Sequence, residues 1–157
     1  MRTVRELMSL SGRVVAITGG AGHVGAAFAE TAAELGATVA LLDLPGRAVP
    51  AAQVLGPQHV GLDVDLARPE TAAQAAQAVV ERCGRLDVLV HCASLVGTSG
   101  LDGWAVPVEQ QTLPAWLRAL DVNLSSAFAL TQAALPALRA HGNGAVVFVG
   151  SIYGAVG

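Results

Sequence analysis

Short apolar segments alternate with longer, alanine-rich segments along most of the chain. The short segments are rich in β-branched residues and contain few polar ones, which is typical of strands covered on both faces of a sheet. Most of them end at glycine, aspartate or serine, where a turn is expected. The predicted strands are residues 14–18, 38–42, 59–62, 86–91 and 145–149.

The longer segments predict helices that connect these strands. Residues 24–35 contain no proline and are followed by Gly36, while residues 69–83 begin at proline and are followed by Gly84. Proline in the first turn and glycine after the last are typical helix boundaries. Residues 114–139 continue the helical pattern, with a candidate break near Asp121, and the four glycine or proline residues within 94–107 indicate a loop.

Alternating strands and helices predict an α/β fold with a doubly wound parallel sheet. Parallel neighbours require a crossover connection, and the helices in these crossovers cover both faces of the sheet in three αβα layers. No proline- or glycine-rich linker divides the chain, so residues 1–157 are predicted to form a single domain.

The composition narrows the classes of function. Of the 157 residues, 53% are hydrophobic and 13% are charged, so the chain is not intrinsically disordered. The net charge is −3, all nine basic residues are arginine, and 4% are aromatic, which argues against a nucleic-acid partner. No uninterrupted apolar run reaches 18 residues, so no membrane span is expected. Cys83 and Cys92 are too few for a zinc cluster or a disulfide framework, which favours no metal and a cytoplasmic location.

The turn after the first predicted strand is the strongest functional signal. Gly20, Gly22 and Gly25 satisfy G-x-G-x-x-G between a strand and a helix. Glycines there permit a tight turn, a close approach of backbone to a pyrophosphate, and close packing of helix on strand. The amides at the helix start then face the anion. The sequence therefore predicts a dinucleotide-binding turn.

Asp43 ends the second predicted strand, 21 residues after Gly22. A carboxylate there is placed to accept hydrogen bonds from the adenosine ribose. It would repel a 2′-phosphate, since two unit charges about 4 Å apart interact by about 4 kcal/mol at an effective dielectric near 20. We therefore expect NAD rather than NADP, although Arg47, four residues on, could offset part of the repulsion.

These features resemble the short-chain dehydrogenase/reductase family, whose Rossmann-type fold matches the predicted sheet. The resemblance runs from about residue 11 to 157. The family's common cofactor turn would have glycine at His23; the spacing of Gly19, Gly22 and Gly25 is instead similar to nucleotide-sugar epimerases and dehydratases. The resemblance implies the following cofactor-binding residues: Thr18, Gly19, Gly20, Gly22, His23, Val24, Gly25, Asp43, Asp63, Val64, Cys92, Ala93 and Ser94.

The same resemblance implies part of a catalytic set. Asn123 matches the family's structural and proton-relay asparagine, and Ser151 matches the serine that orients the substrate. The family's Asn-Asn-Ala-Gly segment corresponds to His91-Cys92-Ala93-Ser94, so both asparagines are replaced. The family's tyrosine and lysine, four residues apart, are absent: Tyr153 is followed four positions later by Gly157. Tyr153 is therefore not the expected proton donor.

The resemblance implies an NAD-dependent oxidoreductase that interconverts a hydroxyl and a carbonyl group on a small molecule. A sugar-like substrate is one candidate, since the loop around Trp104 is similar to loops of members that act on modified sugars. Without the tyrosine–lysine pair and further strands, we expect an incomplete sheet with a bare apolar edge at 145–149, no activity of the chain alone, and a homo-oligomeric whole protein. Two alternatives stay open: a noncatalytic dinucleotide-binding module, and a sugar-nucleotide epimerase or dehydratase with tightly held NAD.

Overall fold

Five parallel strands form the centre of the computed structural model, which describes residues 3–152. Their order in the sheet is β3-β2-β1-β4-β5, so the chain moves outward in one direction from β1 and then in the other from β4. This arrangement confirms the doubly wound parallel sheet predicted from the sequence. The strands are β1 (Val14–Thr18), β2 (Thr38–Asp43), β3 (Val60–Asp63), β4 (Val88–His91) and β5 (Ala145–Phe148).

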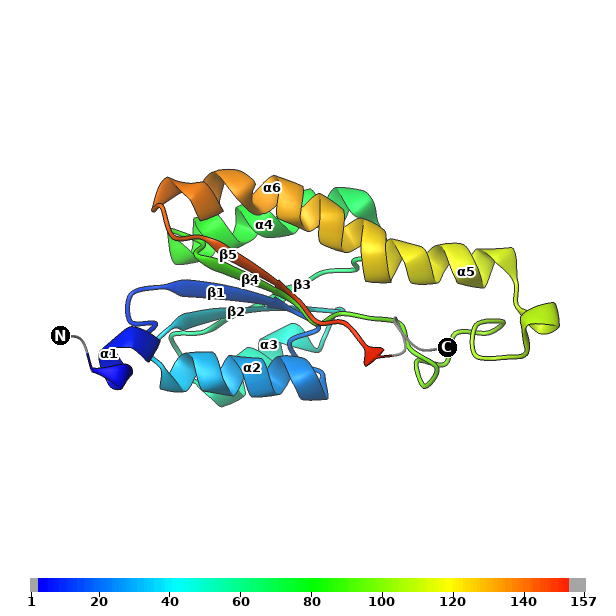
Figure 1. Ribbon diagram of the computed structural model, residues 1–157, viewed down its shortest axis with the longest axis horizontal. Helices are drawn as coiled ribbons and strands as arrows, with labels where there is room; N and C mark the ends of the chain where they lie inside the picture. Colours follow the sequence, from blue (N-terminus) through cyan, green and yellow to red (C-terminus); the bar gives the residue numbers. More distant parts are fainter. Residues whose placement is uncertain (1–2, 153–157) are drawn as a thin grey trace.

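Helices cover the two faces of the sheet and complete the three layers (Figure 1). Helices α2 (His23–Glu34) and α3 (Ala48–Leu55) lie on one face, and α4 (Pro69–Cys83) and α6 (Ser126–Ala140) lie on the other. The short helix α1 (Val4–Met8) precedes the sheet. Helix α5 (Leu113–Leu120) extends the line of α6 beyond the sheet.

Alternate residues of the inner strands supply two apolar cores. Ile17 and Leu41 pack toward α2 and α3, whereas Ala16 and Leu42 pack toward α4 and α6. All four are at most 1% exposed, as expected for strands of a parallel sheet covered on both sides. Full burial of one such aliphatic side chain contributes roughly 1.5–3 kcal/mol, so these inner strands fix the positions of the loops at their ends.

Two helices were not predicted from the sequence. Helix α3 lies within a segment of mixed pattern, although Pro50 in its first turn and Gly56 after its end, at φ +128°, are ordinary helix boundaries. Helix α1 has a reciprocal cap in which Thr3 and Glu6 each accept a hydrogen bond from the other's backbone amide. The candidate break near Asp121 is a single π-helical turn, Asp121–Ser125, between α5 and α6.

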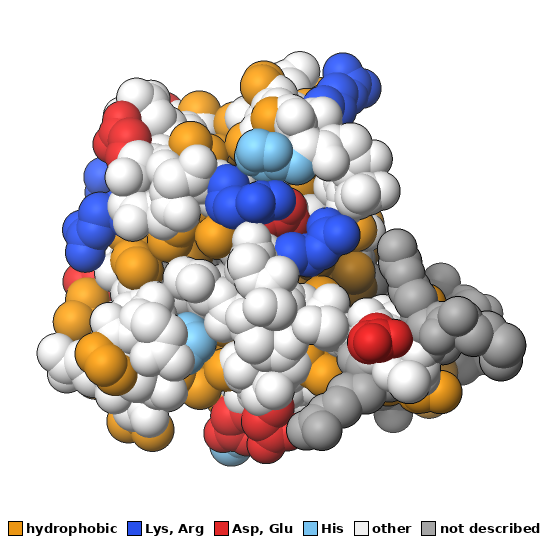
Figure 2. All heavy atoms as spheres, turned by 90° about the vertical axis from the view of Figure 1, so that its left-hand side faces the viewer, with side chains coloured by type: hydrophobic (Ala, Val, Ile, Leu, Met, Phe, Trp, Pro, Cys, Tyr) orange, Lys and Arg blue, Asp and Glu red, His pale blue; other side chains and the backbone are white. Residues whose placement is uncertain are grey.

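Strand β4 begins two residues later than predicted because Asp87 joins strands at the amino edge of the sheet. Its buried carboxylate accepts hydrogen bonds from the Val14 amide at 2.8 Å and from two guanidinium nitrogens of Arg85 at 2.8 and 2.6 Å. Burial raises the pKa of Asp87, but the Arg85 and Val14 hydrogen bonds outweigh it and hold that pKa below its ordinary value. Figure 2 shows this edge, where basic and acidic side chains lie among neutral and apolar ones.

Within residues 3–152, no helix combines the length and apolar character that a membrane span requires.

Candidate functional site

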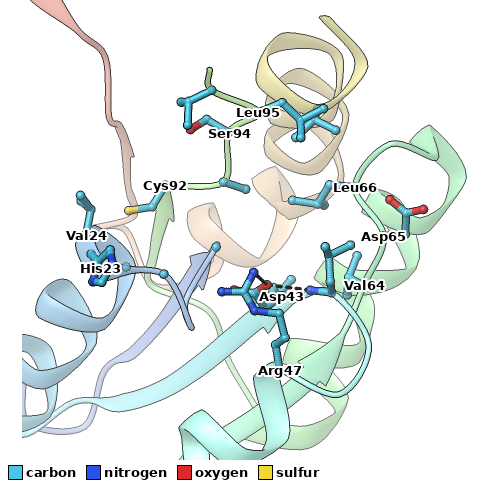
Figure 3. A pocket seen from close by; sticks show the side chains of 18 of the residues that line it. His23, Val24, Asp43, Arg47, Val64, Asp65, Leu66, Cys92, Ser94 and Leu95 are labelled. Carbon is cyan, nitrogen blue, oxygen red and sulfur yellow. Dashed lines mark hydrogen bonds and ion pairs between the residues drawn. The ribbon is translucent and has the colours of Figure 1, made fainter. Parts of the chain in front are cut away.

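Two neighbouring cavities open at the carboxyl edge of the sheet, beside the point where the strand order reverses between β1 and β4. In doubly wound sheets, this is where ligands bind. The first cavity, about 430 Å³, runs from the glycine-rich turn past the end of β2 to the loop after β3 (Figure 3). The second, about 740 Å³, lies between the ends of β4 and β5 and the α6 side. Cys92, Ala93 and Ser94 line both.

The glycine-rich turn is built by close backbone packing. Gly19 has φ +64°, and a Cβ there would lie 2.8 Å from the Ala93 amide nitrogen. A Cβ at Gly25 would overlap the Gly19 carbonyl, so α2 can start this close to β1 only with glycine at both positions. Gly22 lines the cavity, and the nearest atom to a Cβ there would be the Gly19 oxygen at 3.2 Å.

Gly20 has a different role from the other glycines of this turn. It is buried against the Leu41 side chain, 2.6 Å from where its Cβ would be, and it does not line the cavity. The three glycines that face the cavity are Gly19, Gly22 and Gly25. The structure therefore uses the second of the two glycine spacings found in the sequence, Thr-Gly-x-x-Gly-x-x-Gly, to shape the cavity wall.

The amino terminus of α2 points into the first cavity. Its N-cap residue is Gly22, which supplies no side-chain hydrogen bond to the first amides, and the first turn contains no acidic residue. His23, Val24 and Gly25, the first three helical residues, all line the cavity. An uncapped helix start that opens into a cavity offers several backbone N–H groups and the positive end of the helix dipole to an anion.

Asp43 lies next to this helix start, at the end of β2. Its carboxylate accepts hydrogen bonds from the amides of Ala21 at 2.9 Å and Leu44 at 2.8 Å. Arg47 lies 3.4 Å from the same carboxylate and reaches the Ala21 carbonyl at 3.4 Å (Figure 3). Asp43 is 7% exposed and lines the cavity, and a carboxylate has room for more than two hydrogen bonds. It therefore holds the turn in shape and still presents acceptor capacity to a ligand.

The loop after β3 forms the far end of the first cavity. Val64 lines it, but Asp63 does not: the Asp63 carboxylate is exposed and accepts a hydrogen bond from the Gly46 amide at 3.1 Å. Asp65 and Leu66 line the cavity and were not singled out from the sequence. Arg118 of α5 lines it as well, 3.7 Å from the Asp65 carboxylate. Asp65 and Leu66 could have been found by continuing past the end of β3 along the chain. Arg118 could not, because only the tertiary fold brings α5 close to this loop.

Thr18, at the end of β1, holds the 92–94 segment through hydrogen bonds rather than by lining a cavity. Its side chain is fully buried and lines neither cavity, and its Oγ1 accepts a hydrogen bond from the Ala93 amide at 3.2 Å. The carbonyl of Thr18 accepts another from Cys92 at 3.2 Å. Thr18 thus fixes the 92–94 segment against β1. Burial raises the pKa of the half-buried Cys92 thiol, so this thiol is protonated at neutral pH.

Asn123 and Ser151 both line the second cavity. The Asn123 side chain pairs with the backbone of Leu95 twice: its Oδ1 accepts from the Leu95 amide at 2.6 Å and its Nδ2 donates to the Leu95 carbonyl at 3.0 Å. Because Asn123 sits in the π-helical turn, that turn anchors the loop after β4. Ser151 is exposed just beyond the end of β5. Tyr153 lies outside the described residues.

Comparisons with known proteins agree with this geometry. A model of the short chain dehydrogenase family matches residues 13–157. The chain is 35% identical over 146 residues to D-threitol dehydrogenase of Mycolicibacterium smegmatis, covering 90% of this chain and 54% of that protein. It is 32% identical over 148 residues to cis-4-hydroxycyclohexanecarboxylate dehydrogenase of Sinomonas cyclohexanicum, covering 92% and 57%.

A solved structure shows the same likeness. The NADPH-dependent 3-quinuclidinone reductase of Rhodotorula rubra superposes with a TM-score of 0.83 at 30% sequence identity, over 99% of this chain and 58% of that protein. The chain spans about half the length of the curated relatives it matches. Since the family model covers nearly all of the sequence and the fold agrees, the chain belongs to the short-chain dehydrogenase family.

Proposed function

We propose that this chain forms the nicotinamide-dinucleotide-binding part of an oxidoreductase that interconverts a hydroxyl and a carbonyl group on a small molecule. The observation that carries the proposal is the first cavity, where the uncapped start of α2 and the Asp43 carboxylate lie side by side. One group suits a diphosphate and the other a ribose hydroxyl, and a dinucleotide contains both. The names of the relatives, which are dehydrogenases and reductases, support the reaction class.

The described residues fit such a cofactor because the glycine-rich turn has no side chains at Gly19, Gly22 and Gly25, the three positions where it lines the first cavity. Gly22 and the amides of His23, Val24 and Gly25 would hold the diphosphate. Asp43 would accept from the adenosine ribose, and Val64 with Leu66 would contact the adenine. Cys92, Ala93 and Ser94, which join the two cavities, would lie along the nicotinamide end. The cofactor, when bound, supplies the hydride acceptor or donor.

Asp43 supports NAD over NADP in this proposal. Its negative charge would lie beside the 2′-position of the ribose and would disfavour a phosphate there. The Arg47 guanidinium, at 3.4 Å, weakens this discrimination because it neutralises part of the charge. Arg47 already pairs with Asp43 and with the Ala21 carbonyl, so a 2′-phosphate would have to compete for it.

Ser151 and Asn123 are proposed to serve the chemical step from the second cavity. Ser151 would hydrogen-bond the reacting oxygen, and Asn123 would act through Leu95 by holding the loop that borders both cavities. The 157 residues contain no lysine and a single tyrosine, so they do not include the expected tyrosine–lysine pair. Cofactor binding, rather than turnover, is therefore what we propose for these residues by themselves.

Fluorescence titration with NADH and NADPH tests the proposal. We expect saturable binding of both, with NADH bound more tightly, and we expect Gly22→Val to abolish it by placing a branched side chain in the diphosphate space. Gly97→Val is the matched control, because Gly97 lines neither cavity and a Cβ there would meet only the Ala105 Cβ, at an ordinary 3.7 Å. A folded wild-type chain that binds neither dinucleotide would contradict the proposal.

The glycine spacing favours one second candidate. Gly19, Gly22 and Gly25 line the cavity in the spacing similar to sugar-nucleotide epimerases and dehydratases. Such an enzyme would retain NAD through purification and would show no net change in cofactor redox state during turnover. Net NADH formation with a simple alcohol would decide for the dehydrogenase, and binding without any turnover in the intact natural protein would indicate a noncatalytic module.

A further inference from the structure

His91 lines the second cavity and directly precedes the Cys92–Ser94 segment, which borders both cavities. It is the last residue of β4, and it lies beside Thr18 of β1 and Phe148 of β5 in the sheet register. Its side chain is 6% exposed. A histidine that is buried at the end of a central strand must find partners for both ring nitrogens or lose stability.

The Nδ1 atom of His91 contacts Thr18, which in turn binds the Ala93 amide beside the first cavity. His91 Nδ1 lies 3.4 Å from Thr18 Oγ1, the same oxygen that accepts a hydrogen bond from the Ala93 amide. A hydroxyl can donate one hydrogen bond and accept two, so Thr18 can accept from Ala93 and donate its own proton to Nδ1, and this is the arrangement that the inference assigns. The amide of Ala93, which borders both cavities, is thus held by a hydroxyl that His91 orients.

The other contacts of the ring reach the opposite side. His91 Nε2 lies 3.5 Å from Thr131 Oγ1 on α6, and in the same assignment it carries the ring proton and donates there. The imidazole also stacks on the Phe148 ring, with centroids 5.2 Å apart and planes inclined by 3°. The His91 carbonyl accepts a hydrogen bond from Val149 at 3.0 Å. Phe148 and Val149 lead directly to Ser151, so the ring supports the segment that carries that serine.

We propose that His91 is a positioning residue whose neutral ring, protonated at Nε2, connects the Ala93 amide of the cofactor cavity to the strand end that carries Ser151. The inference rests on the proposed function, since it assigns His91 a role in cofactor and substrate placement. It gives this chain a substitute for the asparagine that its family resemblance would place at this position. The ring must stay neutral for this role, because a protonated Nδ1 is a donor and could no longer accept the hydroxyl proton of Thr18.

Burial supports a neutral ring. Removal from water lowers the pKa of His91 from 6.5 to about 4. The ring's partners are two threonine hydroxyls and one aromatic ring, none of which titrates near neutral pH.

The protonation state can be measured without any cofactor. In ¹⁵N nuclear magnetic resonance spectra of the intact natural protein at pH 7, the His91 ring is expected to show an unprotonated Nδ1 and a protonated Nε2. Exposed His141 at the end of α6 provides an internal reference signal. A His91 ring that is charged at pH 7, or protonated at Nδ1, would overturn the proposal.

Three substitutions then test the connection. His91→Phe keeps a flat ring on Phe148 but removes both nitrogens, and should weaken NADH binding about fivefold, the loss of roughly one hydrogen bond. His91→Asn keeps a polar group near Thr18 and loses the Thr131 and Phe148 contacts. It should therefore retain NADH affinity but lower kcat in the intact enzyme. Thr131→Val should leave NADH affinity unchanged and alter the Nε2 signal of His91.

The outcomes separate this inference from the proposed function. If the wild-type protein binds no dinucleotide, the proposed function fails, while the ring spectrum still tests the tautomer. If the wild-type protein binds NADH and folded His91→Phe binds it equally well, the positioning role fails and the proposed function stands. His141→Phe is the control for replacing an exposed histidine with an aromatic ring, and should change neither NADH affinity nor kcat. Should His91→Phe fail to fold, the kcat of His91→Asn decides, and an unchanged kcat would refute the connection.

Discussion

The two sides of the crevice differ in how completely they are covered. On the β1–β2 side, every residue of β1 and all but the first of β2 are buried. Asp43 and Thr18 hold the backbone of the cavity wall in place through the Ala21 and Ala93 amides. On the β5 side, Val147, Phe148 and Val149 are 39%, 60% and 44% exposed. The β1–β2 side is buried beneath the wall of the first cavity, whereas the β5 side exposes apolar side chains at the sheet edge. Binding and chemistry should therefore respond differently to substitution.

The largest effect is expected from Gly25→Ala on the covered side. The added methyl group would overlap the Gly19 carbonyl, and backbone there has no room to move because Gly19 packs on Ala93. We expect a loss of about 3 kcal/mol or more in unfolding free energy, measured by urea denaturation, together with loss of NADH binding. Gly150→Ala, on the β5 side, should change stability by less than about 0.5 kcal/mol. Equal effects at the two glycines would contradict the contrast between the sides.

Acid should destabilise the protein through His91, which lies between the two sides. In the unfolded chain a histidine titrates near 6.5, whereas the folded pKa of His91 is about 4. Between these values the unfolded chain binds more protons, so unfolding free energy should fall as the pH drops from 6.5 to 4, by roughly 3 kcal/mol in all.

The variant His91→Phe sharpens that measurement. Most of the pH dependence between 6.5 and 4 should disappear in it, and a smaller dependence of the same sign should persist from His59, whose pKa burial also lowers. Urea denaturation at closely spaced pH values measures both. An unchanged pH dependence in His91→Phe would show that the ring is not buried in a neutral form.

Cofactor preference should shift with Asp43→Asn. Removing the charge relieves repulsion of a 2′-phosphate and leaves Arg47 free to attract it, so the ratio of NADPH to NADH affinity should rise about tenfold, or about 1.4 kcal/mol. The amide keeps only one acceptor oxygen for the Ala21 and Leu44 amides, so a small loss of stability should accompany the change. Calorimetric titration with both dinucleotides measures the ratio. An unchanged ratio would show that Asp43 does not face the ribose.

The smallest effect is expected from Arg118→Ala, at the end of the first cavity formed by the loop after β3. The Arg118–Asp65 pair is 3.7 Å apart and both side chains are partly exposed to water, at 48% and 29%. Such pairs contribute below about 1 kcal/mol and weaken with salt. NADH affinity should fall less than about threefold at low salt, and not at all at high salt. A larger, salt-independent loss would mean that Arg118 contacts the cofactor directly.

The parts of the site that the sequence predicted are those encoded locally. The glycine-rich turn connects adjacent elements, and the end of β2 follows from its apolar run, so the positions of Gly22 and Asp43 could be read in advance. The sheet order follows from the alternation of strands and helices. Asp63 was predicted with Val64 from the family resemblance; in the structure its carboxylate instead accepts from the Gly46 amide, a contact with a turn 17 residues earlier that the sequence pattern does not show.

The parts that could not be predicted depend on tertiary contacts. The pairing of Arg118 with Asp65 brings α5 to the loop after β3. The pairing of Asn123 with Leu95 depends on a π-helical turn, which the sequence indicated only as a candidate break near Asp121. Helix α3 was missed because its alanines give little periodic signal. The burial of His91 between Thr18, Thr131 and Phe148 joins three elements far apart in the chain.

A crystal structure of the protein with NAD bound tests the central claim most directly. The account predicts the diphosphate within hydrogen-bond distance of the His23, Val24 and Gly25 amides, and a ribose hydroxyl within hydrogen-bond distance of the Asp43 carboxylate. Dinucleotide bound elsewhere, or a ribose that does not touch Asp43 while the diphosphate avoids the start of α2, would contradict it.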